Sequence, residues 1–227
     1  GKICFKIDFK LIKIILNYSL VIGFTAIAYF LYSKADILVL GHFNYINEIG
    51  YYEIVNKIFE MIKVPIFVLA TVISPIITNY YVEKKYHLVK KKFIYHFFVF
   101  LLLGFLLSIF LYFLMPVLIK LFFSRYFTPE TILIFNLLLF ILPLRVIATI
   151  VSQSYTIATG HASISLWTMI PAGFLNILLD FIFIYFFGFI GVVFSTLICY
   201  SFATIALIII YYFKLNKKVM SKNVSFK

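Results

Sequence analysis

The stretch FIYHFFVFLLLGFLLSIFLYFL, residues 93–114, decides the fold class of this chain. It contains no Asp, Glu, Lys or Arg. Its length matches the run of roughly 20 apolar residues that crosses the hydrocarbon core of a bilayer as a helix. The stretch therefore predicts a transmembrane helix.

The composition of the whole chain agrees with this interpretation. Of the 227 residues, 64% are apolar and 12% are charged, and the mean hydropathy is +1.10. Ordinary soluble domains are roughly 45–50% apolar and about 25% charged. The net charge is +12, but the Lys residues gather at the borders of apolar runs, which argues against nucleic acid as a partner. We expect an all-α, multi-pass protein that resides in the lipid bilayer of the cell (cytoplasmic) membrane.

Six segments are long and apolar enough to be transmembrane helices, and we expect Pro65, Pro75 and Pro143 to bend them. Gly188 and Gly191 predict a tight turn between the last two. Residues 115–130 are too few to span and predict an interfacial amphipathic stretch. The expected organisation is a basic cytoplasmic lead-in (1–13), a six-helix transmembrane lobe (14–213) and a basic cytoplasmic tail (214–227). The expected helices are Ile14 to Gly41, Ile49 to Tyr81, Phe93 to Leu114, Glu130 to Ile157, Ser163 to Phe186 and Ile190 to Phe213.

The basic residues in the loops predict the orientation of these helices. Most of the 20 Lys and Arg residues lie before the first helix, in the loop EKKYHLVKKK (residues 83–92) or after the last helix. Only Lys120 and Arg125 lie between the third and fourth helices. Because cytoplasmic loops carry an excess of Lys and Arg, both termini are expected in the cytoplasm.

The second expected helix carries charges in its first half. A charge at the bilayer centre costs about 2.5–3.5 kcal/mol on insertion scales and usually faces a cavity or a partner. Glu53, Lys57 and Glu60 have i, i+4, i+7 spacing, which places them on one face and predicts that each neutralises its neighbour. In the alternative interpretation the first turns of this helix project into water, and Lys63 reaches an interface.

Lys34 and Asp36 carry charge into the first expected helix. They are two residues apart and point to nearly opposite sides of a helix, so they cannot both face one cavity squarely. We expect one of them to contact a neighbouring helix. The alternative for Lys34 is that it extends to the membrane interface.

Arg145 lies near the middle of the fourth expected helix, directly after the expected bend. A buried guanidinium needs a carboxylate, a phosphate or water as a partner. One interpretation is a structural pair with Asp180, which has Asn176 one turn earlier on the same face; the other is an anion-binding role. Ser152, Gln153, Ser154 and Thr156 extend a polar stripe further along this helix, which either lines a path or makes hydrogen bonds between helices.

Motifs of enzymes and of metal sites are missing. The chain has no nucleophile elbow, no Gly-rich phosphate loop and no paired catalytic carboxylates. His42, His87, His96 and His161 have no carboxylate at a metal-ligand spacing, and the two cysteines, Cys4 and Cys199, fit neither a disulfide framework nor a metal site. We therefore expect neither an enzyme nor a cofactor.

Several short motifs, in order, resemble the second half of polysaccharide and lipid-linked oligosaccharide flippases of the multidrug/oligosaccharidyl-lipid/polysaccharide exporter superfamily. A Lys stands two residues before an Asp, followed by LGxF, GYY and SP in the next helix, and later by a TG turn, an Asn and GxxGV. The resemblance covers roughly residues 10 to 213 and implies the carboxy-terminal six-helix lobe of a transporter, with a second, amino-terminal lobe as its partner. A start at Gly1 rather than Met likewise favours a piece of a longer chain. The residues that carry these motifs are Lys34, Asp36, Leu40, Gly41, Phe43, Gly50, Tyr51, Tyr52, Ser74, Pro75, Thr159, Gly160, Asn176, Gly188, Gly191 and Val192.

The resemblance implies transport by alternating access, in which two lobes rock about a central cavity. It implies a lipid-linked anionic glycan as the ligand, because Arg pairs bidentately with the oxygens of a pyrophosphate. Our hypothesis is that Arg145, Lys57 and Lys34 bind this group. Asp36, Glu60 and Asp180 are expected to hold or release these cations as their charge partners.

Two other functions stay open at this point. A cation-coupled multidrug exporter of the same superfamily would use Asp36 and Asp180 to bind Na⁺ or H⁺. Four positive and four acidic residues within the spans balance each other, so charge does not decide between the two transporters. The third possibility is a membrane scaffold in which every charge forms a structural pair and nothing is transported.

Overall fold

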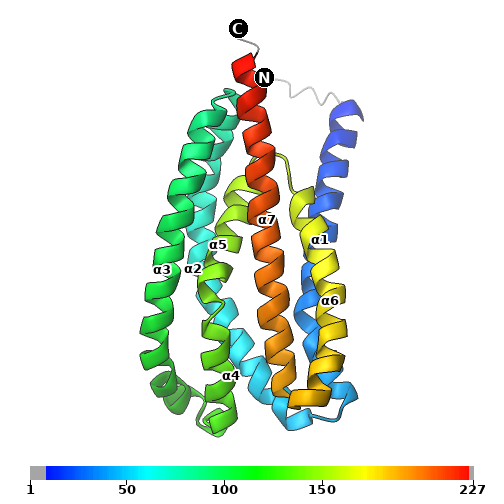
Figure 1. Ribbon diagram of the computed structural model, residues 1–227, viewed down its shortest axis with the longest axis vertical. Helices are drawn as coiled ribbons and strands as arrows, with labels where there is room; N and C mark the ends of the chain where they lie inside the picture. The colour runs from blue at the N-terminus through cyan, green and yellow to red at the C-terminus, as the bar shows by residue number, and fades with distance from the viewer. Residues whose placement is uncertain (1–8, 225–227) are drawn as a thin grey trace, which may run out of the picture.

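The computed structural model describes residues 9–224, and every regular element in that range is a helix, as expected. Figure 1 shows long helices standing side by side, with α7 between α3 on one side and α6 and α1 on the other. The elements are α1 (Phe9–His42), α2 (Ile46–Val82), α3 (Tyr86–Phe122), the 3₁₀ turn η1 (Ser124–Tyr126), α4 (Pro129–Leu139), α5 (Leu142–Val151), the π-helical turn η2 (Ser152–Ile157), α6 (Ser163–Phe187) and α7 (Ile190–Val224).

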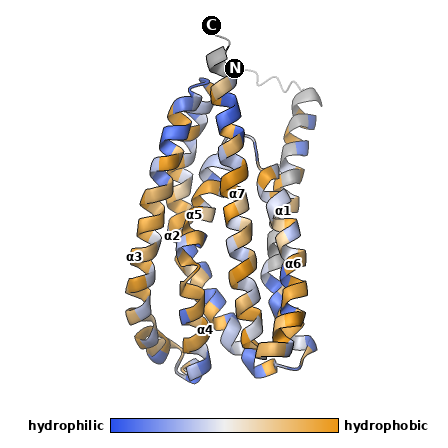
Figure 2. Cartoon of the chain, viewed as in Figure 1, coloured by the Kyte–Doolittle hydropathy of each residue, from blue (hydrophilic) through white to orange (hydrophobic). Residues whose placement is uncertain are grey.

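Four helices in the described range are long and apolar enough to cross a membrane: α2, α3, α6 and α7 over Ile190–Ser221. The pair formed by α4 and Leu142–Ile157 passes the same test as one broken span, bent by 50°. Figure 2 shows the apolar residues concentrated along the middle of these helices and the hydrophilic residues towards their ends. A crossing by α1, the first expected span, stays a prediction, because the described part of α1 qualifies as an apolar helix only over Ile15–Phe24, which is too short to span.

The beginning of α1, the α2–α3 loop and the end of α7 lie at the same end of the bundle (Figure 1). These are three regions where the sequence concentrates its Lys residues. If the chain crosses the membrane an even number of times, the beginning of α1 and the end of α7 must lie on the same side, as they do here. The assignment of this end to the cytoplasm remains the prediction made from the charge distribution.

The fourth expected helix is broken, and the break lies just before Pro143. Pro143 has no backbone N–H to donate and sits in the first turn of α5, where that loss is tolerated. Gly104 of α3 makes room for the proline ring, because a Cβ on Gly104 would lie 2.5 Å from the Cα of Pro143. The break starts a new helix three residues before Arg145, whose N–H bonds the carbonyl of Ile141 at 2.9 Å.

Several helices extend beyond the expected bounds: α1 begins at Phe9 and α3 at Tyr86, and α3 and α7 also end later than expected. Residues 115–122 continue α3, so the expected interfacial stretch is reduced to η1 and its flanks. The last helix, α7, continues to Val224, through most of the expected tail. Hydropathy locates where a helix leaves the lipid, whereas the backbone hydrogen bonds continue until a cap or a turn ends them.

Candidate functional site

A cavity of about 310 Å³ lies between α1, α2, α5 and α7, and we call it the cationic pocket. The break before α5 and the long second helix bring charged residues distant in sequence to its wall. Five of the six sequence-predicted site residues line it, and Asp180 does not. The charged lining residues are Lys34, Asp36, Glu53, Lys57, Glu60, Lys63 and Arg145.

Arg145 is held in the pocket by aromatic rings. Its guanidinium carbon lies 4.9 Å from the ring centre of Phe59 on α2 and 5.2 Å from that of Tyr200 on α7. Both distances suit cation–π contacts. Its Nε is buried and has no hydrogen-bond partner. Arg145 therefore enters the pocket with part of its donor capacity unused.

Of the two interpretations of Arg145, the structural pair with Asp180 does not form. No described carboxylate forms a salt bridge with Arg145. Asp180 is fully buried and accepts hydrogen bonds from Ser195 and, at 3.2 Å, from Asn176. Sequence separation and helix face do not determine which buried polar groups contact each other. Here Asp180 on α6 contacts Ser195 on α7.

The charges of α2 pair differently from the expectation. Glu53 accepts from Lys34 of α1 at 2.5 Å, and Glu60 accepts from Lys63 one turn further along α2 at 3.4 Å. The helix face was predicted correctly, but Lys57 is not neutralised by its neighbours. It is exposed and forms no salt bridge with a described residue. Lys57 and Arg145 are thus the two cations of the pocket outside ion pairs.

Asp36 lies in a buried polar cluster, so the prediction that one of Lys34 and Asp36 contacts a neighbouring helix is correct; both nevertheless line the cationic pocket, contrary to the expectation that they could not share one cavity. Asp36 accepts hydrogen bonds from Asn176 at 2.5 Å, from Thr196 at 2.8 Å and from Tyr52. Together with Asp180 and Ser195, these residues form what we call the carboxylate cluster, at the meeting point of α1, α2, α6 and α7. Each member is 5% exposed or less.

The tight turn between α6 and α7 makes this cluster possible. Gly188 has φ +60°, a conformation that favours glycine, and it ends α6. A Cβ on Gly191 would lie 2.3 Å from the carbonyl carbon of Phe183, so only glycine lets the two helices approach this closely. The approach places Ser195 and Thr196 against the carboxylates.

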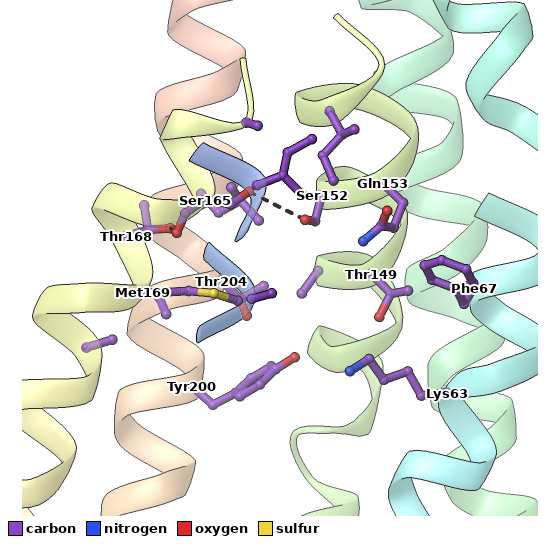
Figure 3. Close-up of a pocket in the computed structure, with 18 residues that line it drawn as sticks. Lys63, Phe67, Thr149, Ser152, Gln153, Ser165, Thr168, Met169, Tyr200 and Thr204 are labelled. Carbon is purple, nitrogen blue, oxygen red and sulfur yellow. Dashed lines mark hydrogen bonds between the residues drawn. The ribbon is translucent and has the colours of Figure 1, made fainter. Parts of the chain in front are cut away.

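A second cavity of about 310 Å³ lies next to the cationic pocket, and we call it the neutral cavity. The two cavities share Lys63, Thr149 and Tyr200 in their walls. Figure 3 shows hydroxyl and amide side chains around it, with Lys63 at the edge near Tyr200. Its polar lining residues otherwise are Thr149, Ser152, Gln153, Ser165, Thr168 and Thr204.

The polar stripe after Arg145 makes hydrogen bonds between helices and also lines a cavity. Ser154 donates to the carbonyl of Ala70 on α2 at 2.8 Å, and Thr156 lies 3.2 Å from the hydroxyl of Ser165 on α6. Ser152 and Gln153 line the neutral cavity, and the Ser152 hydroxyl also lies 3.4 Å from that of Ser165. The stripe coincides with the π-helical turn η2, a local distortion that is frequent at functional sites.

Sequence reasoning missed three members of the carboxylate cluster: Tyr52, Ser195 and Thr196. The adjacent hydroxyls of Ser195 and Thr196 inside an apolar run were the available signal. No group of three or more His, Cys, Asp or Glu side chains that could hold a metal occurs in the described part of the chain. The arrangement can bind an anion in the cationic pocket and a proton or small cation between the carboxylates.

Comparison with known proteins supports a transporter. A family model described as MatE matches residues 22–186, which is most of the chain. Searches of curated proteins and of solved structures gave no match. MatE proteins are membrane transporters and not enzymes, which favours transport over the scaffold interpretation. The chain belongs to the MatE family of multi-pass membrane transporters.

Proposed function

We propose that the chain is the carboxy-terminal lobe of a flippase that moves a lipid-linked pyrophosphate oligosaccharide or polysaccharide precursor across the cytoplasmic membrane by alternating access. A second, amino-terminal six-helix lobe would complete the transporter. The observation that carries the proposal is the presence in one pocket of Arg145 and Lys57, two cations that form no ion pair with a described residue.

The ion pairs within the pocket explain why a net positive site remains. Lys34 is matched by Glu53 and Lys63 by Glu60, and Asp36 is occupied by three hydrogen-bond donors. A phosphate group at Arg145 and Lys57 would neutralise both remaining cations. This would offset the cost of holding charge within the membrane.

Arg145 suits a phosphate better than a lysine would. Its planar guanidinium presents donors in a fork that matches two phosphate oxygens, and such charge-assisted bonds are roughly twice as strong as neutral ones. The rings of Phe59 and Tyr200 restrict the guanidinium before a ligand arrives. Little side-chain entropy is then lost on binding.

Replacing Arg145 by Ala tests the proposal in cells that depend on the intact transporter for glycan export. We expect export to be abolished while the amount of protein in the membrane is unchanged. Arg125→Ala is the matched control, since Arg125 is exposed in η1 and lines none of the pockets described here. Normal export by Arg145→Ala would remove Arg145 from the mechanism.

The carboxylate cluster favours a second candidate function, a cation-coupled multidrug exporter. Asp36 and Asp180 lie on either side of Asn176, whose Oδ1 is buried without a hydrogen-bond partner. Because the Nδ2 of Asn176 bonds both carboxylates, its Oδ1 faces away from them, and the two buried carboxylates are the groups that would take up a proton or Na⁺. Efflux of a cationic dye that depends on a Na⁺ or H⁺ gradient and is lost in Asp180→Asn would support it. Dye efflux independent of both gradients would exclude it.

A further inference from the structure

We infer that the neutral cavity is the subsite for the sugar part of the ligand, so that a neutral, polyhydroxylated group lies beside the anion in the cationic pocket. This inference rests on the proposed function, and it assigns the cavity lined by η2, α6 and α7 a ligand class. The argument uses the side chains of the cavity, its connections and its charge.

The cavity presents hydrogen-bonding groups that the protein itself leaves unused. Gln153 of η2 and Thr204 of α7 line the cavity and make no hydrogen bond to another described residue (Figure 3). Thr204 is 3% exposed and lines the cavity, so what its side chain exposes lies at the cavity wall. Both side chains are free to hydrogen-bond a ligand, and each such bond is worth about 0.5–1.5 kcal/mol. A ligand with hydroxyl groups would provide the partners for these bonds.

The charge in the cavity excludes most other ligands. Among its described lining residues only Lys63 carries a formal charge; it stands at the boundary with the cationic pocket and is paired with Glu60. A second anion would find no partner here, and a cation would find no carboxylate. Neutral hydroxyl and amide side chains together with an aromatic ring are the groups that hold a sugar. Tyr200 and Phe67 supply such rings, onto which the C–H face of a sugar can pack.

The connections of the cavity match a chain of sugars attached to a phosphate. It shares part of its wall with the cationic pocket, through Thr149 and Tyr200. On its other side Gln153 and Ile157 also line a third pocket, which is formed with Ser74, Thr78 and Asn79 of α2. Neutral polar side chains therefore continue from the phosphate position along α2 and η2. A volume of about 310 Å³ lies at the lower end of the range for ligand pockets.

Two soluble probes separate the sugar contribution from that of the phosphate. We would measure binding of farnesyl pyrophosphate, and of the same lipid with N-acetylglucosamine on its pyrophosphate, to the purified full chain in detergent micelles. We expect the sugar to tighten binding at least tenfold. Gln153→Leu and Thr204→Val should each reduce this gain to less than threefold, with binding of farnesyl pyrophosphate changed less than twofold.

Asn136→Leu serves as the matched control for Gln153→Leu, since Asn136 lies on α4 and lines none of these cavities. It should keep the full gain from the sugar. If farnesyl pyrophosphate binds but the sugar adds nothing, or if both cavity variants keep the gain, the subsite is refuted and the proposed function stands. If neither probe binds, the proposed function fails, and this inference fails with it.

Discussion

Asn176 offers the sharpest test of the carboxylate cluster, through its replacement by Leu, which has a similar size. The Asn176 amide donates to Asp36 at 2.5 Å and to Asp180 at 3.2 Å, and its side chain is fully buried. Each hydrogen bond to a charged group is worth about 1.5–3 kcal/mol, so the variant loses about 3–6 kcal/mol. The same variant removes an unpaired Oδ1, which returns about 1–3 kcal/mol. The two ranges combine to a destabilisation of about 0–5 kcal/mol, with a central expectation of about 2–3 kcal/mol.

Cys199 provides the assay for this change. It is buried on α7, so a thiol-reactive dye labels it only as the protein unfolds; Cys4→Ser would serve as the background. A loss of 2–3 kcal/mol corresponds to a fall of about 5–10 °C in the unfolding midpoint for a chain of this size.

The matched control for Asn176→Leu is Asn136→Leu. Asn136 Oδ1 is also buried without a partner, but no described hydrogen bond of its side chain would be lost. The free energy of unfolding should therefore stay the same or rise. Equal midpoints for Asn176→Leu and the background protein would refute the hydrogen-bond network between the carboxylates.

Three shorter predictions concern other contacts. Gly191→Ala places a Cβ against the backbone of α6 and should cost at least about 1–3 kcal/mol in the same unfolding assay. A double-mutant cycle on Lys34 and Glu53 should give a coupling energy of only about 0.5–1 kcal/mol, because the Lys34 side chain is 43% exposed. Burial, and then two lysines of α7, lower the pKa of His161 in the loop before α6, so the folded protein favours its neutral form. Its contribution to stability should be complete above about pH 6.5 and lost as the pH falls through the lowered pKa, and His161→Gln should flatten this dependence of the unfolding midpoint.

Hydropathy predicted the helices well where an apolar run meets a loop. The sequence places the fifth helix at Ser163 to Phe186, and the structure has Ser163–Phe187. The expected and observed helix ends agree less well where no Gly, Pro or turn ends the helix as it leaves the lipid, as at the end of α3. The fold class and most boundaries therefore follow from the sequence, because lipid leaves the backbone few alternatives to helix.

The site was predicted in part, for a physical reason. The cost of intramembrane charge correctly indicated that Arg145 and Lys57 face a common space. The partner of each charge depends on the rotation and depth of neighbouring helices, which periodicity does not encode. The sequence therefore failed to predict the pairing of Glu53 with Lys34 and the isolation of Asp180 from Arg145.

The different pairing of the lysines gives a prediction specific to the cationic pocket. Lys57 has no ion pair, whereas Lys63 is bound to Glu60. Lys57→Met should therefore weaken binding of farnesyl pyrophosphate, and Glu60→Gln should strengthen it by releasing Lys63. A unit charge in the pocket interacts with a unit charge of the ligand about 10 Å away by about 1.7 kcal/mol at an effective dielectric constant of about 20, and by less when salt is present. We expect the dissociation constant of farnesyl pyrophosphate to rise about five- to tenfold in Lys57→Met and to fall by a similar factor in Glu60→Gln. Both changes should become smaller as salt is added. Changes in the same direction would show that the pocket does not select its ligand by charge.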